Sequence, residues 1–143
     1  MKHTRQPGIG TLFHATSRQS VREVIESISA KAPEFGFIVR HVFDMRKEYI
    51  EHHVNVSDGF DLCQIMVCNM QGSYASMSRN MERAAVIFQP KQITVFSDGG
   101  VTSVNYFPLN ERCIADALPK DEQFHKGLSQ ACLKIVDMIK AAV

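Results

Sequence analysis

The sequence contains no apolar run of signal-peptide length and no stretch long enough to span a bilayer. These absences predict a cytoplasmic protein without a membrane partner. The 16 basic and 15 acidic residues leave a net charge of +1, so no excess of positive charge favours nucleic acid as a partner. Polyanions and membrane surfaces are therefore set aside as main partners.

The sequence also has few features of cofactor or metal chemistry. It has four cysteines, and no two of them have the Cys-x-x-Cys spacing of a zinc or thioredoxin-type site. In a reducing compartment they are expected as free thiols. A Ser-His-Asp set, a Walker sequence and a nucleotide fingerprint are absent too. The sequence predicts no cofactor and no metal site, and it leaves open whether the protein is an enzyme.

The composition is that of one globular domain. The 143 residues are 45% hydrophobic and 22% charged, which is enough for a core without disulfides or metals. We predict a flexible N-terminus at residues 1–9 and a single domain over 10–143. No internal repeat or low-complexity segment divides it.

Hydrophobic periodicity and turn residues predict the secondary structure. A capping box of Ser20 and Glu23 opens a helix, and the last helix begins between Pro119 and Asp121. Strands are expected at 10–15, 37–43, 62–68, 93–97 and 101–107, with further helices at 45–53 and 70–85 and an irregular connection at 109–121. This order predicts an α+β two-layer sandwich, with a mixed or antiparallel sheet of about five strands and helices on one face.

Two of these segments have the clearest patterns. The stretch 62–68 is nearly all apolar, which is typical of an interior strand. Asp98-Gly99-Gly100 lies between two short strands and predicts a tight hairpin. Between them, five residues recur at helical spacing, namely Met70, Tyr74, Met77, Met81 and Ala85, and the three methionines are expected to pack in the core.

The strand-to-helix corner at Cys68 and Asn69 is the best candidate for chemistry. Asn69 is expected to cap the helix. A thiol beside the helix N-terminus would have its thiolate favoured, and Lys91 would add to this effect if the Pro90 loop folds back. The alternative is that Cys68 is a small buried residue with a structural role only, since free cysteine is among the most buried residue types.

These residues also suggest a family. Cys68-Asn69 at the end of a buried strand, Ser73-Tyr74 in the helix, and Pro90 before the strand Ile93–Phe96 resemble the domain-of-unknown-function 302 family. The resemblance implies a compact α+β domain and a homodimer, and it implies no established reaction. Two positions depart from the family pattern, because Met70 replaces a motif proline and Lys91 replaces a second cysteine.

Three hypotheses on function follow. The first is a dimeric small-ligand-binding or accessory module, with Asn69, Tyr74, Pro90 and Lys91 as ligand-binding residues. The second is a thiol-dependent enzyme or sulfur carrier that uses Cys68 as its catalytic residue.

The third hypothesis is metal or haem binding through His41, His52 and His53, because neutral imidazole is a common ligand. Adjacent histidines on a helix point in different directions, however, and no His-x-x-x-His spacing is present. Solvated surface histidines are therefore the preferred interpretation.

Overall fold

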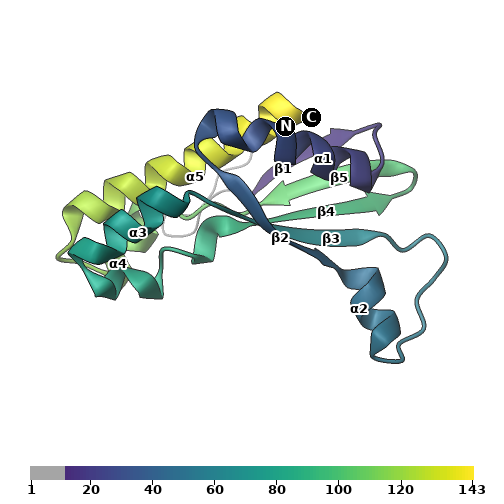
Figure 1. Cartoon of the computed structure of the whole chain (residues 1–143), viewed down its shortest axis with the longest axis horizontal. Coiled ribbons are helices and arrows are strands. Elements are labelled where there is room, and N and C mark those ends of the chain that lie inside the picture. Colours follow the sequence, from purple (N-terminus) through teal and green to yellow (C-terminus); the bar gives the residue numbers. More distant parts are fainter. Residues whose placement is uncertain (1–11) are drawn as a thin grey trace.

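One antiparallel sheet with two helices packed on one face forms the body of the protein (Figure 1). The structure is a computed structural model, and it describes residues 12–143. The predicted flexible N-terminus and the start of the predicted first strand lie outside these residues. The elements follow in the order β1 (Phe13–Ser17), α1 (Val21–Lys31), η1 (Ala32–Phe35), β2 (Ile38–Asp44), α2 (Met45–Glu51), β3 (Leu62–Cys68), α3 (Met70–Arg79), η2 (Met81–Ala85), η3 (Gln89–Lys91), β4 (Gln92–Asp98), β5 (Val101–Tyr106), α4 (Glu111–Ala117) and α5 (Glu122–Ala142).

The sheet has the strand order β1-β5-β4-β3-β2, and every neighbouring pair is antiparallel. The predicted α+β class with about five strands is therefore confirmed, and β3 is the interior strand that its apolar sequence indicated. Gly99 and Gly100 connect β4 and β5 with φ angles of 60° and 82°. A two-residue hairpin turn of this type requires positive φ at both central residues, which glycine adopts without a steric cost.

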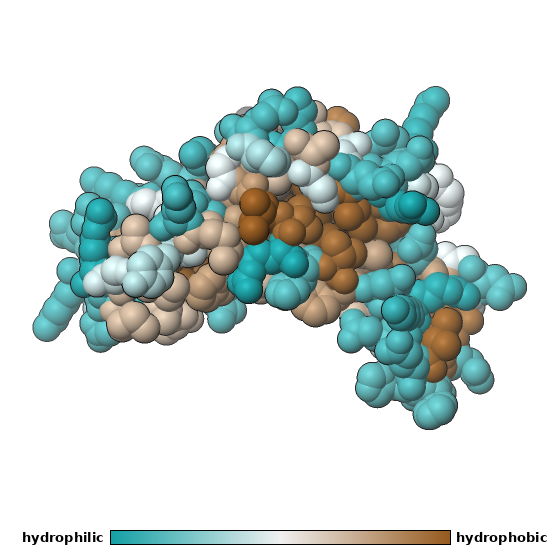
Figure 2. All heavy atoms as spheres, in the orientation of Figure 1, coloured by the Kyte–Doolittle hydropathy of each residue, from teal (hydrophilic) through white to brown (hydrophobic). Residues whose placement is uncertain are grey.

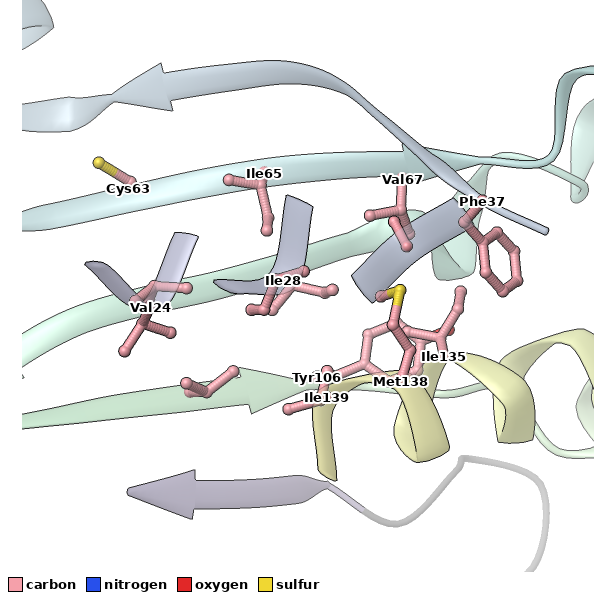
Figure 3. Packing of buried hydrophobic residues seen from close by; sticks show 14 of the residues in the cluster. Val24, Ile28, Phe37, Cys63, Ile65, Val67, Tyr106, Ile135, Met138 and Ile139 are labelled. Atoms are coloured by element: carbon pink, nitrogen blue, oxygen red, sulfur yellow. The ribbon is translucent and has the colours of Figure 1, made fainter. Parts of the chain in front are cut away.

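The main core lies between the sheet and the helices α1 and α5 (Figure 3). Alternate residues of β3, namely Cys63, Ile65 and Val67, are buried toward the helices, as the two-residue period of a strand requires. The helices contribute residues at helical spacing, among them Val24, Ile28, Ile135, Met138 and Ile139.

A second, smaller core lies beyond the sheet, where α4 and the first half of α5 meet the segment after α3. Its buried members are Val86, Ile87, Ile114, Phe124 and Leu128. The long helix α5 therefore joins the two cores, because its first half packs in one and its second half in the other. No helix in the described part of the chain is both long and apolar enough to cross a membrane.

Two expectations from the sequence were wrong. Residues 109–121 are not irregular throughout, because they contain α4, whose first turn is capped by Asn110 accepting a hydrogen bond from the backbone N–H of Cys113 at 2.8 Å. Two methionines of the helical stripe that were expected in the core are exposed: Met70 is 50% and Met81 is 70% exposed. The helix ends at Arg79 and lies beyond the sheet, so no second layer covers that stripe.

Candidate functional site

The corner between β3 and α3 has the predicted capping geometry. The Asn69 side chain accepts a hydrogen bond from the backbone N–H of Gly72 at 2.9 Å, which confirms Asn69 as the helix cap. Cys68 is 1% exposed, and its Sγ lies 3.5 Å from Oγ of Ser73 in the first turn of α3. The thiol is thus inside the protein, behind the serine hydroxyl.

Lys91 is buried at this corner. It is 4% exposed, which is unusual for a lysine. Its Nζ lies 5.7 Å from the ring centroid of Phe37, within the range of a cation–π contact. Burial lowers the pKa of Lys91, and the nearby Cys132 and Cys68 thiols oppose that shift. In the described part of the chain, Nζ makes no hydrogen bond and no ion pair.

A cavity of about 370 Å³ lies between α3 and the first half of α5, which run alongside each other in Figure 1. From α3 it is lined by Gly72, Ser73 and Ser76, which share one helix face. From α5 it is lined by one face as well: Gln123, Gly127, Gln130 and Lys134. The volume is that of a site for a small molecule.

The charged residues that line the cavity are all positive. Four lining residues are cations, namely Arg79, Arg83, Lys91 and Lys134. No aspartate or glutamate is among the lining residues that the structure describes. Since the whole chain has a net charge of only +1, positive charge is concentrated here.

One of these cations is neutralised by a buried ion pair. Arg83 donates to both carboxylate oxygens of Asp121, at 2.7 Å from Nε and 2.9 Å from Nη2. Its Nη1 also donates to Ser76, and Asn80 donates to the same carboxylate at 3.1 Å. These bonds lower the pKa of Asp121 from 3.8 to about 2, with the bond from Arg83 as the largest cause. The pair joins η2 to the start of α5.

A second cavity, of about 590 Å³, borders the same ion pair and differs in charge. Its lining contains the anions Glu82 and Asp121 together with the cations Arg79, Arg83 and Lys120. Mixed charge gives it no preference for a ligand of one sign. The cavity between α3 and α5 is therefore the candidate site.

Of the sequence-predicted ligand residues, the structure brings two into this cavity and leaves Tyr74 outside its lining. Asn69 and Lys91 line it. Tyr74 is on α3 but is 74% exposed and does not line the cavity. Pro90 precedes Lys91 in η3. Cys68 is adjacent, through its contact with Ser73, but is not itself part of the lining.

The histidines of the third hypothesis lie elsewhere, on β2 and at the end of α2. The His41 ring packs on Phe43, with centroids 5.6 Å apart, and Nδ1 of His52 lies 2.8 Å from the backbone oxygen of Glu48. His53 is exposed. Within residues 12–143, no group of three or more potential ligand side chains is close enough to hold a metal ion.

Sequence reasoning missed Arg79, Arg83 and Lys134, and it missed the polar face of α5. The available signal was the spacing of Gln123, Gly127, Gln130 and Lys134, which places them on one helix face. The same spacing describes an ordinary solvated face, so only the packing against α3 distinguishes the two.

The comparison with known families agrees with the residues at the corner. Residues 13–142 match the family described as "Domain of unknown function DUF302". The chain belongs to the DUF302 family. This confirms the resemblance seen in the Cys68-Asn69 motif and in the order of the elements.

A solved structure of similar fold supports the membership. The crystal structure of an uncharacterized conserved DUF302 protein from Bacillus stearothermophilus has 16% sequence identity to this chain and a TM-score of 0.67. The match covers 90% of this chain and 97% of that protein. No curated protein matches the chain. At this identity the likeness establishes the DUF302 fold and carries no activity.

Proposed function

We propose that this DUF302 protein is a small-ligand-binding or accessory module, whose ligand occupies the cavity between α3 and α5. One observation carries the proposal: a cavity of about 370 Å³ contains a lysine, Lys91, that is 4% exposed and has no anionic partner in the described part of the chain. A buried cation without a partner is costly in a protein interior, whereas a bound ligand can satisfy it. A cytoplasmic location belongs to this proposal and rests on the sequence alone.

Gly127 provides a test that leaves the cationic residues unchanged. It lines the cavity on α5, and a Cβ built there meets no atom within 4 Å. Gly127→Phe therefore has room for its Cβ and should place a ring in the cavity, and thermal unfolding checks that the packing is kept. Gly127→Ala adds only a methyl group and should stabilise the helix by about 1 kcal/mol through helix propensity.

The measurement is a two-dimensional NMR titration with a panel of small aromatic fragments, both neutral and charged. We expect at least one fragment to shift the backbone amides of Ser73, Ser76 and Gly127. These shifts should persist in Gly127→Ala and disappear in Gly127→Phe. If no fragment moves these amides, or if Gly127→Phe binds as the wild type does, the cavity is not the ligand site.

The pairing of two copies is a separate part of the proposal. The arm formed by β2, α2 and the loop that follows projects from the body, and β2 is an edge strand of the sheet (Figure 1). Six large apolar residues of the arm are 39–53% exposed: Ile38, Val42, Phe43, Tyr49, Ile50 and Val54. Figure 2 shows hydrophobic surface along β2 and on α2.

A symmetric contact between two arms would cover this surface, since a two-fold interface uses the same patch on both copies. Exposed apolar residues gathered on one element mark interaction surfaces more often than singly scattered ones do. The occupant that we propose is a second copy of this chain, as the resemblance to the family also implies.

Thiol chemistry at Cys68 is the second candidate function. The observation that favours it is the Lys91 ammonium, which interacts electrostatically with both the Cys68 and Cys132 thiols. A neighbouring cation favours a thiolate, which is the nucleophilic form. Cys63 is in the opposite environment, since burial and the carboxylates of Asp44 and Asp61 raise its pKa to about 11.

Cys132 is a control for Cys68 that is equally buried and shares the Lys91 ammonium, but it lies within α5 and not at the start of α3. If Cys68 is a functional thiol, iodoacetamide near neutral pH should modify it at least tenfold faster than Cys132, and Lys91→Met should slow that reaction. Mass spectrometry of the modified peptides gives both rates. Equal rates for Cys68 and Cys132 would make the thiol structural and would leave the binding module as the remaining function.

A further inference from the structure

Lys91 indicates which ligand charge the cavity would accept, because its ammonium has no anionic partner among residues 12–143. The side chain is 4% exposed, and its ammonium lies 5.7 Å from the centroid of the Phe37 ring and is accessible from the cavity, with no hydrogen bond or ion pair in the described part of the chain. The attraction of a ring face offsets only part of the desolvation of a buried ammonium, and an anion would offset far more. The groups that face this ammonium from β3 and α5 are the thiols of Cys68 and Cys132, and neither carries the fixed negative charge of a carboxylate.

The other cations of the cavity lining also favour an anionic ligand. Arg79 and Lys134 line it from α3 and α5, and both are exposed. Arg83 is already paired with Asp121, so three of the four cations remain for a ligand. A concave site with charges of one sign and apolar walls focuses their field on a ligand of the opposite sign.

The uncharged residues of the cavity lining indicate the chemistry of the rest of the ligand. Ile87, Phe124 and Leu128 are buried members of the second core, and they also form part of the cavity lining. Ser73 and Ser76 provide hydroxyl groups in the same lining. Apolar walls with a small number of polar groups are typical of sites for small organic molecules.

We propose that the ligand of this cavity is an organic anion, a carboxylate or phosphate head on a small apolar body, and that Lys91 binds the head. This inference rests on the proposed binding function and specifies the class of ligand. Lys134 and Arg79 attract the anion at the opening, and the second core contacts its apolar part.

The test is isothermal titration calorimetry with two pairs of probes. Phenyl phosphate is compared with benzyl alcohol, and benzoate with benzamide, so that each anion has a neutral partner of similar shape. Each anion should bind at least tenfold more tightly than its neutral partner. Lys91→Met should weaken phenyl phosphate about 10- to 100-fold, as expected for the loss of one hydrogen bond between charged groups.

A stability measurement and one further variant keep the result interpretable. Lys91→Met removes a buried charge and should fold at least as stably as the wild type, which thermal unfolding verifies. Lys134→Gln changes an exposed residue, so it cannot fail by unfolding, and it should weaken phenyl phosphate several-fold. Anion affinities that stay within twofold of the wild type in both variants would overturn the assignment of the anion to this site.

The outcomes separate this inference from the binding function itself. Neutral and anionic probes that bind equally well, and that both fail to bind to Gly127→Phe, would retain the binding site and overturn the anionic class. Anions that bind Gly127→Phe as they bind the wild type would overturn both.

Discussion

Replacement of Arg83 by methionine should destabilise the protein by about 3–5 kcal/mol, because it leaves a carboxylate without its main partner in the interior. The side chains of Arg83 and Asp121 are 7% and 14% exposed, and two hydrogen bonds join them. Urea denaturation at pH 7 measures the loss. The exposed Arg79, four residues earlier, is the matched control, and Arg79→Met should change the free energy of unfolding by no more than about 0.5 kcal/mol.

The pH dependence gives an independent check of the same ion pair. The pKa of Asp121 is lowered from 3.8 to about 2 in the folded protein, so its contribution to stability is fully present above about pH 4. That contribution is lost as the pH falls from 4 toward 2. The difference in stability between the wild type and Arg83→Met should narrow over this range. A difference below 1 kcal/mol at pH 7, or one that does not narrow in acid, would contradict this account of the pair.

Placing a charge on the arm should dissociate the proposed dimer. Ile50 is on α2, is 53% exposed and belongs to a helix with no buried residue, so Ile50→Glu should not affect the folding of the monomer. A central interface residue contributes about 2 kcal/mol, and a two-fold contact contains two copies of it. The expected loss of about 4 kcal/mol corresponds to roughly a 1,000-fold weaker dimer.

Sedimentation equilibrium at micromolar concentration measures this effect. The wild type should sediment at twice the 16.1 kDa mass of the chain, and Ile50→Glu at the mass of one chain. Leu133→Glu is the control, because Leu133 is 60% exposed but lies on α5, away from the arm. A wild type of 16.1 kDa, or an Ile50→Glu variant that stays dimeric, would show that the arm is not the dimer interface.

Much of the fold could be predicted from the sequence, because local patterns determine it. The apolar residues of β3 and the two glycines after Asp98 restrict the backbone through burial and positive φ, and neither effect depends on distant partners. Asn69 is similar, since a helix cap is a contact between residues three positions apart. The resemblance to DUF302 proteins, carried by Cys68 and Asn69, was likewise local.

The errors come from packing that no local pattern specifies. In α4, Ile114 is the only buried residue, so a helix of seven residues shows no hydrophobic period. Met70 does lie at helical spacing with Tyr74, but its helix extends past the sheet, and nothing in the spacing indicates that.

The candidate site was only half predictable for the same reason. Asn69 and Lys91 were selected for their place beside Cys68, and both line the cavity. The burial of Lys91 contradicts the usual exposure of lysine and results from the position of the segment before β4, next to Phe37 and Cys132. Lys134 is 43 positions further along the chain than Lys91, and only the packing of α5 against α3 brings it to the same cavity.

A crystal structure of the protein soaked with phenyl phosphate would test the central claim most directly. The account predicts the ligand between α3 and α5, with a phosphate oxygen about 3 Å from Nζ of Lys91 and the ring against Phe124 and Leu128. A saturated crystal in which this cavity holds no phenyl phosphate, or in which the phosphate is bound away from Lys91, would contradict it.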